Sequence, residues 1–130
     1  MTTDDITVGR YMTRSPHTIG RDQTLKTASE VMREHGVRHL PVLHGGQLLG
    51  ILSNRDVFLV ESLEGVDEDA VTVEEAMTAE PYIVAEGDDL KSVVTTMAES
   101  KFGAAVVMEG RNVTGIFTTI DALNALGDRL

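Results

Sequence analysis

Residues 50–56 read GILSNRD, and residues 115–121 read GIFTTID. Each stretch has Gly-Ile, then a hydroxyl residue three positions after the glycine, then an aspartate three positions later. The two stretches lie 65 positions apart, and the same offset aligns residues 8–57 with residues 73–122 without a gap. Because a half of about 50 residues buries little core alone, we expect the two copies to pack on each other and form one domain.

Hydrophobic spacing predicts the same order of elements, β-α-β-β-α, in both copies. In the first copy, Leu25, Ala28 and Met32 recur at helical spacing, Thr24 can cap the start of that helix, and Gly36 can end it. The other elements expected there are a helical turn at 8–12, an extended segment at 15–19, strands at 37–43 and 48–52 around a turn at 44–47, and a helix at 53–62. In the second copy we expect a helix at 90–100, strands at 104–108 and 113–117 around a turn at 109–112, and a helix at 119–126. The predicted fold class is therefore α/β (α+β), with repeats at 8–62 and 73–126 and an exposed acidic linker at 63–72.

Composition favours a compact soluble domain without a membrane span. The 130 residues are 42% hydrophobic, include no cysteine and carry a formal net charge of -10. The lack of cysteine excludes disulfides and thiolate metal sites, and the lack of a basic, apolar signal segment favours the cytoplasm. Residues 66–130 carry 4 Lys/Arg against 13 Asp/Glu, and an acidic field opposes binding to a nucleic-acid backbone.

The repeated Gly-Ile-x-Ser/Thr-x-x-Asp motif stands where a strand ends and a helix begins. A hydroxyl beside free backbone N–H groups can bind a phosphate there, and an aspartate one turn later can accept hydrogen bonds from two ribose hydroxyls. The same pattern also forms a capping box, which needs no ligand. The duplication, with a glycine where a ligand or backbone must approach closely, favours a binding role for Ser53 and Asp56.

Two further side chains of the first copy could bind an anion. Arg38 and His39 interrupt a strand whose other residues, at 37–42, are apolar. An arginine offers a phosphate a fixed charged fork, and a histidine can add a second donor. The alternative is that Arg38 is exposed on the free face of an edge strand. With Ser53, Arg55 and Asp56 nearby in the expected fold, we favour the site.

No motif indicates catalysis or a metal. Of the four histidines, only His35 and His39 have a helical spacing, and Gly36 separates them, so we expect no metal site. The chain has no Walker A loop, no Gly-x-Ser-x-Gly and no nucleophile with an evident base. We also expect no room for a separate catalytic domain in 130 residues, and therefore a chain that is not an enzyme and requires no cofactor.

The order of these motifs resembles the cystathionine-β-synthase (CBS) domain pair, also called a Bateman module. The resemblance covers nearly all of residues 1–130 and rests on V-x3-MT-x2-P at 8–16, GVRHLPV at 36–42 and the duplicated motif. It implies paired β-α-β-β-α units packed through their sheets, with two clefts that bind adenosine-containing ligands. Such pairs commonly regulate enzymes, channels or transporters, and two pairs commonly assemble into a flat disc.

The resemblance also implies roles for individual residues. In the first copy it assigns Ser53, Arg38 and His39 to phosphate and Asp56 to ribose. It assigns the adenine to Val37 and to the backbone of the segment formed by Ser15, Pro16, His17 and Thr18. In the second copy the matching positions are Thr118 and Asp121 for the motif, with Pro81, Tyr82 and Ile83 for the base.

The second copy departs from this pattern where phosphate would bind. Gly103, Ala104 and Ile120 stand where the first copy has Arg38, His39 and Arg55. We therefore expect weaker phosphate binding at the second site.

These observations predict a cytoplasmic regulatory or sensor module that binds an adenine nucleotide (AMP, ADP or ATP) and signals through its conformation or assembly. S-adenosylmethionine is an alternative ligand. A dimerisation module without a ligand, a small hydrolase or nucleotidyl transferase, and a nucleic-acid binder are alternative functions. Apolar residues expected on the helical faces predict a homodimer of pairs: Leu59, Val60, Leu123 and Leu126.

Overall fold

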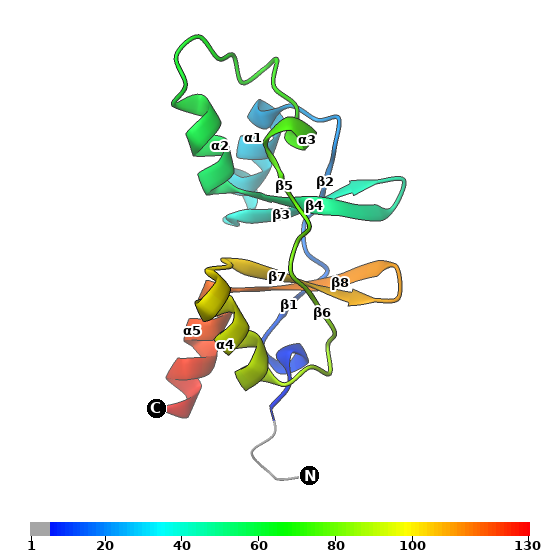
Figure 1. Ribbon diagram of the computed structural model, residues 1–130, viewed down its shortest axis with the longest axis vertical. Helices are drawn as coiled ribbons and strands as arrows, with labels where there is room; N and C mark the ends of the chain where they lie inside the picture. The colour runs from blue at the N-terminus through cyan, green and yellow to red at the C-terminus, as the bar shows by residue number, and fades with distance from the viewer. Residues whose placement is uncertain (1–5) are drawn as a thin grey trace. The chain divides into compact units, whose positions relative to one another are not determined.

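The computed structural model describes residues 6–130, which form two compact units (Figure 1). Unit 1 comprises residues 6–16 and 82–130, and unit 2 comprises residues 17–81. Each unit combines the first segment of one repeat copy with the body of the other, so the units do not coincide with the sequence repeats. None of the helices within residues 6–130 has the length and apolarity that a membrane crossing requires.

Unit 2 is a four-stranded sheet packed against helices. Its elements are β2 (Ile19–Gly20), α1 (Leu25–His35), β3 (His39–His44), β4 (Gln47–Ser53), α2 (Asn54–Glu61), α3 (Val73–Ala76) and β5 (Thr78–Ala79). The strand order is β2-β3-β4-β5, with β2 parallel to β3 and the other neighbours antiparallel. Fully buried Leu25, Leu40 and Leu52 belong to its core, which joins the helices to the sheet.

Unit 1 has the same design. Its elements are the 3-10 helix η1 (Val8–Arg10), β1 (Thr13–Arg14), β6 (Ile83–Val84), α4 (Leu90–Ser100), β7 (Ala104–Glu109), β8 (Asn112–Thr118) and α5 (Thr119–Arg129). The strand order is β1-β8-β7-β6, with β6 parallel to β7. Val8, Val107 and Phe117 are fully buried in its core. The α+β fold class predicted from the sequence is confirmed.

Helix α1 starts and ends at the residues that the sequence predicts. The Thr24 side chain accepts a hydrogen bond from the backbone N–H of Thr27, and Gly36 adopts a left-handed conformation with φ +64°. Helices α2 and α4 also have the expected ends. Helix α5 instead continues to Arg129, beyond the end expected at residue 126, because no left-handed residue interrupts it there.

The hairpin turn predicted at 44–47 is confirmed. Gly45 and Gly46 form its two-residue loop with φ of +57° and +81°, as this tight turn requires. The preceding strand begins at His39 and not at Val37, since the Val37 N–H bonds the Met32 carbonyl at 3.0 Å and completes the end of α1.

The segment expected to be extended at 15–19 bends at its first residue. Ser15 has φ +48°, and Glu80 at the matched position has φ +59°. Each precedes a proline, which disfavours the right-handed helical region for the residue before it. The correction is therefore a left-handed residue at Ser15 in place of an extended one, and Glu80 has the same conformation in the second copy.

The two copies exchange their first strands. Strand β1 of the first copy pairs with β8 of the second, and β5 of the second pairs with β4 of the first. The motif glycines lie at these crossings: a Cβ on Gly50 would stand 2.6 Å from the Thr78 carbonyl oxygen, and one on Gly115 would stand 3.0 Å from the Thr13 carbonyl oxygen. A glycine is needed where either a ligand or a backbone segment approaches closely. At these two positions the approaching group is backbone.

Most of the segment at 63–72 is exposed, as predicted, yet it is attached to unit 2. The backbone N–H of Leu25 bonds the Val71 carbonyl at 3.0 Å, and that of Lys26 bonds the Glu68 carbonyl at 3.3 Å.

Val60 was expected among the exposed apolar residues of the helical faces. That expectation is wrong, because Val60 is partly buried and packs against the unit 2 core.

Candidate ligand site

Ser53 and Asp56 form a capping box at the start of α2. Ser53 Oγ accepts a hydrogen bond from the Asp56 N–H, and Asp56 Oδ2 accepts one from the Ser53 N–H, both at 3.0 Å. The capping interpretation of the motif is therefore confirmed. Within residues 6–130, no hydrogen bond reaches Asp56 Oδ1. One carboxylate oxygen thus remains able to accept hydrogen bonds from a ligand.

The matched aspartate of the second copy is engaged more fully. Thr118 and Asp121 form the same box at the start of α5, where Asp121 Oδ2 accepts from the Thr118 N–H at 2.9 Å. Thr13 Oγ1 also donates to Asp121 Oδ1 at 3.3 Å, and Asp121 is only 9% exposed. Thr78, which matches Thr13, reaches only Asp56 Oδ2, at 3.5 Å. Asp121 is therefore a structural group, whereas Asp56 retains a free acceptor.

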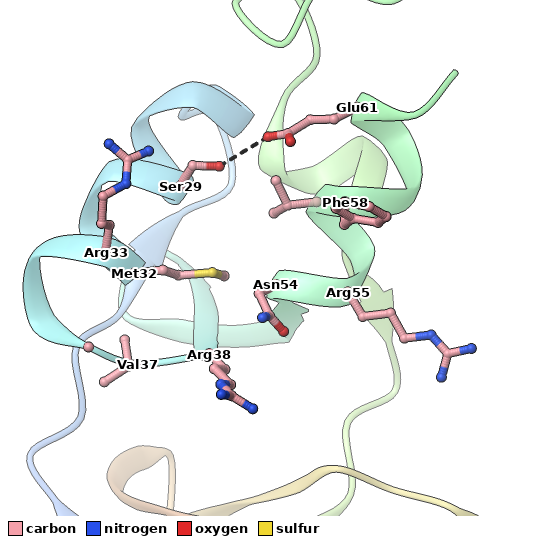
Figure 2. A pocket seen from close by; sticks show the side chains of 11 residues that line it. Ser29, Met32, Arg33, Val37, Arg38, Asn54, Arg55, Phe58 and Glu61 are labelled. Atoms are coloured by element: carbon pink, nitrogen blue, oxygen red, sulfur yellow. Dashed lines mark hydrogen bonds between the residues drawn. The ribbon is translucent and has the colours of Figure 1, made fainter. Parts of the chain in front are cut away.

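Arg38 and Arg55 line one pocket of unit 2, with a volume of about 670 Å³ between α1 and α2 (Figure 2). The Asn54 N–H bonds the Arg38 carbonyl at 2.8 Å and so fixes the start of β3 beside the first turn of α2. Figure 2 shows Arg38 and Asn54 at one edge of the pocket and the Arg55 side chain extending outward from α2. Both arginines are exposed, so their guanidinium groups are accessible to an anion.

The rest of the pocket comes from the two helices. Arg33 and Ser29 line it from α1, and Phe58 and Glu61 line it from α2. Ser29 Oγ donates a hydrogen bond to Glu61 Oε1 at 3.3 Å, which joins the two walls at one end. Arg33 is a cationic lining residue that the sequence analysis missed. Its place in the last turn of α1, ahead of Gly36, is the signal that could have identified it.

His39 lies opposite Ser53 in the β3–β4 ladder and is partly buried. Burial lowers the pKa of His39; the charge of Asp56 opposes this shift, and the charge of Arg38 adds to it. His39 is therefore neutral at pH 7 and can donate or accept a hydrogen bond without adding charge.

The residues predicted to contact adenine divide between the units. Ser15 and Pro16 belong to unit 1, and His17 and Thr18 belong to unit 2, where the His17 ring stacks on His35 at 3.6 Å between centroids. Val37, also in unit 2, lines the pocket with Arg38.

In the second copy, Pro81 belongs to unit 2, and Tyr82 and Ile83 belong to unit 1. Tyr82 stacks on Phe102, with 5.2 Å between ring centroids. Phe102 occupies the position matched to Val37.

Unit 1 has a pocket at the place matched to the unit 2 pocket, but its lining is apolar. Its volume is about 510 Å³, and its walls include Val94, Ala98, Phe102 and Leu123. No arginine lines it, and Lys101 is its cationic lining residue. The positions matched to Arg38 and Arg55 are Gly103 and Ile120, so the arginines of the unit 2 pocket have no counterpart here.

The sequence profile of the CBS domain matches residues 8–62 and residues 73–128. The chain belongs to the CBS domain family. This CBS chain is 30% identical over 112 residues to inosine-5′-monophosphate dehydrogenase of Korarchaeum cryptofilum. That match covers 85% of the CBS chain and 22% of the relative, so the chain spans about a fifth of that protein's length.

Solved structures of CBS proteins share the fold over nearly the whole chain. CBSX2 in complex with AMP is 25% identical with a TM-score of 0.83, and the match covers 94% of this chain and 97% of CBSX2. The CBS domain pair of protein MJ0100, in complex with 5′-methylthioadenosine and S-adenosyl-L-methionine, is 23% identical with a TM-score of 0.88. That match covers 97% of this chain and 99% of the MJ0100 chain. The resemblance to a CBS domain pair drawn from the motifs is confirmed.

In the part of the CBS chain that the structure describes, no three His, Cys, Asp or Glu residues gather as a metal site would need. The stacked pair His17 and His35 has no third ligand-type residue beside it to complete such a group.

Proposed function

We propose that this CBS domain pair binds an adenine nucleotide at the unit 2 site and acts as a regulatory module without catalysis. The observations that carry the proposal are that Arg38 and Arg55 line one pocket and that Asp56, which follows Arg55 in the first turn of α2, has an Oδ1 that accepts no hydrogen bond within residues 6–130. A phosphate needs fixed cationic donors, and ribose hydroxyls need a free acceptor. The AMP complex of CBSX2, which is 25% identical, supports the same class of ligand.

Each side chain has a distinct role in this proposal. Arg38 and Arg55 bind the phosphate as charged forks. The Ser53 hydroxyl accepts the cap hydrogen bond and still has its own proton to donate to a phosphate oxygen. His39 adds a neutral donor, and Asp56 Oδ1 accepts from the ribose.

The ribose role is tested by calorimetry with AMP and 2′,3′-dideoxy-AMP. Loss of the hydroxyls leaves Asp56 without its ligand partners, so the dideoxy compound binds about tenfold more weakly. This estimate takes the cost of an unpaired group as roughly 1 to 3 kcal/mol of binding free energy. Asp56→Ala abolishes this discrimination and binds both compounds equally. Equal affinity of the unmodified chain for both compounds overturns the ribose role.

The phosphate role is tested with AMP and adenosine. Arg38→Ala weakens AMP binding about tenfold or more, because a charge-assisted hydrogen bond contributes roughly 1.5 to 3 kcal/mol, and changes adenosine binding little. Arg111→Ala is the matched control, since it removes one exposed arginine from the β7–β8 hairpin. Equal losses for AMP and adenosine in Arg38→Ala would assign Arg38 to folding or to the base.

The second copy binds phosphate-bearing ligands more weakly in this proposal. Gly103, Ala104 and Ile120 replace the three cationic or donor side chains, and Asp121 is already engaged with Thr13. Thr118→Ala therefore changes AMP affinity little. A crystal with nucleotide bound only by the second motif reverses the assignment.

The chemical identity of the ligand follows from mass spectrometry of small molecules released by the purified chain. AMP, ADP, ATP and S-adenosylmethionine each have a distinct mass. If no adenosine compound raises the melting temperature, a dimerisation module without a ligand is the better description. Sustained turnover of nucleotide by the pure chain would contradict the non-catalytic role.

We also propose that two copies associate through their helical faces and that the module acts in the cytoplasm. Leu59, Leu123 and Leu126 are 54%, 60% and 53% exposed, and a two-fold contact is the commonest way to cover such residues. Light scattering at micromolar concentration tests the association. A mass near 14.1 kDa contradicts it.

A further inference from the structure

Arg33 is a third arginine of the unit 2 pocket, besides Arg38 and Arg55. Figure 2 shows Arg33 on α1, across the pocket from Arg55 on α2, with Arg38 at the lower edge between them. All three are exposed, and the ion pairs formed within residues 6–130 involve none of them. Glu61, the acidic residue of the lining, accepts a hydrogen bond from Ser29 instead. Three guanidinium groups without an ion-pair partner thus border one pocket.

Backbone hydrogen bonds fix the positions from which these side chains extend. The Val37 N–H bonds the Met32 carbonyl at 3.0 Å and so closes the end of α1. Arg33 lies within this closed turn, and Arg38 directly follows it. The Arg38 carbonyl accepts a hydrogen bond from the Asn54 N–H at 2.8 Å, which ties the turn to the start of α2. The backbone that carries the arginines is therefore in place before a ligand binds, which lowers the entropy cost of binding.

The fold itself does not require these arginines. Unit 1 closes the equivalent turn with a hydrogen bond from the Phe102 N–H to the Met97 carbonyl at 2.9 Å. It also has the equivalent bond from the Thr119 N–H to the Gly103 carbonyl, at 3.2 Å. At the offset of 65, the residues of unit 1 that match the three arginines are Ala98, Gly103 and Ile120. Because the same turn forms there without a cation, the arginines of unit 2 have no structural role that the repeat demands.

A single phosphate group does not use all three arginines. A guanidinium is a planar fork that pairs with two oxygens of a phosphate, and a terminal phosphate offers only three such oxygens. The proposed function already assigns the phosphate of AMP to Arg38, Arg55 and the Ser53 hydroxyl. Arg33, on the opposite helix, then has no partner. Since like charges around one pocket repel each other, the pocket favours a ligand with more negative charge than AMP carries.

We propose that Arg33 binds the second phosphate of the nucleotide, so that the unit 2 pocket takes adenosine diphosphate or triphosphate in preference to AMP. Arg38 and Arg55 keep the first phosphate, and Arg33 binds the phosphate chain that extends from it across the pocket. The inference rests on the proposed nucleotide site of unit 2. It adds the class of nucleotide and the residue that selects it.

Calorimetry with AMP, ADP and ATP tests the preference, in buffer with a chelator so that no divalent cation neutralises the phosphate chain. ADP binds the unmodified chain about tenfold more tightly than AMP, which is the contribution of one charge-assisted hydrogen bond. ATP binds at least as tightly as ADP. Equal affinities for AMP and ADP overturn the inference and leave the nucleotide site in place, whereas a lack of binding by all three compounds overturns the proposed function itself.

Arg33→Ala isolates the contribution of this residue. Alanine is a strong helix former, so the change preserves α1. It weakens ADP binding about tenfold and AMP binding by no more than about twofold, which removes the preference. Lys26→Ala is the matched control, because it removes a positive charge from the same helix at a residue that does not line the pocket. We expect Lys26→Ala to leave the ratio of ADP to AMP affinity unchanged.

Arg33→Lys keeps the charge but replaces the fork by a single ammonium group. Its preference for ADP lies between those of the unmodified chain and Arg33→Ala. Equal losses of AMP and ADP binding in Arg33→Ala assign Arg33 to the fold or to the first phosphate and overturn the inference. A change of the ratio in Lys26→Ala as large as that in Arg33→Ala also overturns it, since the effect is then the net charge of α1 and not a contact.

Discussion

Replacing Gly50 by alanine tests what the glycine of the repeated motif does. The added Cβ would stand 2.6 Å from the Thr78 carbonyl oxygen and 2.8 Å from the Met77 sulfur. The oxygen belongs to the backbone of β5, so strand β5 has to move away from β4. At Gly115, the nearest atom is the flexible Met12 sulfur at 2.8 Å, and the Thr13 carbonyl oxygen stands at 3.0 Å, so the backbone has to move less than at Gly50.

The magnitudes follow from these distances. Overpacking a close contact costs about 1 to 3 kcal/mol, and alanine recovers about 0.4 to 1 kcal/mol by restricting the unfolded chain. Gly50→Ala therefore lowers the free energy of unfolding by about 2 kcal/mol, and Gly115→Ala by about 1 kcal/mol. Gly20→Ala is the matched control, because its Cβ would meet no atom closer than 3.9 Å. We expect it to be neutral or slightly stabilising.

Urea unfolding followed by circular dichroism measures all three variants under one set of conditions. The expected order of stability is Gly20→Ala, then Gly115→Ala, then Gly50→Ala, with an unchanged dependence on urea concentration. If Gly50→Ala and Gly20→Ala are equally stable while AMP binding is lost in the former, then the glycine serves a ligand and the strand-crossing argument is wrong.

Two further outcomes follow from the site geometry. Asp121→Ala lowers the free energy of unfolding by about 1 to 3 kcal/mol more than Asp56→Ala, because only Asp121 is buried and bonded to Thr13; equal losses in urea unfolding would refute this. Burial lowers the pKa of His39 in the folded chain, so the unfolded chain binds a proton at this residue first as the pH falls. The contribution of His39 to the free energy of unfolding is therefore full above the unfolded pKa of about 6.5 and is lost as the pH drops below it. His39→Gln should reduce this fall between pH 7.5 and 5.5, whereas His44→Gln at the hairpin end serves as the control; an unchanged pH dependence in His39→Gln would count against the burial effect.

Much of the local structure could be predicted because local rules decide it. Thr24 and Gly36 bound α1 by hydrogen bonds and dihedral angles within a few residues, and Gly45-Gly46 specify a tight hairpin turn in the same way. The errors lie where a neighbouring element competes. Val37 completes the end of α1 before β3 can begin, and Val60 turns partly into the core.

The candidate site was predicted in part. The motif predicted that Ser53 and Asp56 stand at a helix start, because strand, cap and helix are adjacent in sequence, and Arg38 and Arg55 line one pocket beside that helix. That these residues bind a ligand stays a prediction. Arg33 was missed, since only the packing of α1 beside α2 brings it to the same pocket. The difference between Asp56 and Asp121 was also invisible, because it depends on a threonine more than 100 residues away.

The sequence by itself determined the repeat, the order of elements, the family and the loss of cationic residues in the second copy, because each of these is written in residue type and spacing. Only the tertiary structure decided which segments belong together. The first strand of each copy pairs with the sheet of the other, so Thr13 supports Asp121 and the Thr78 backbone excludes a side chain at Gly50. Strand pairing between distant segments depends on which edges meet in space, and no local pattern in either partner records that choice.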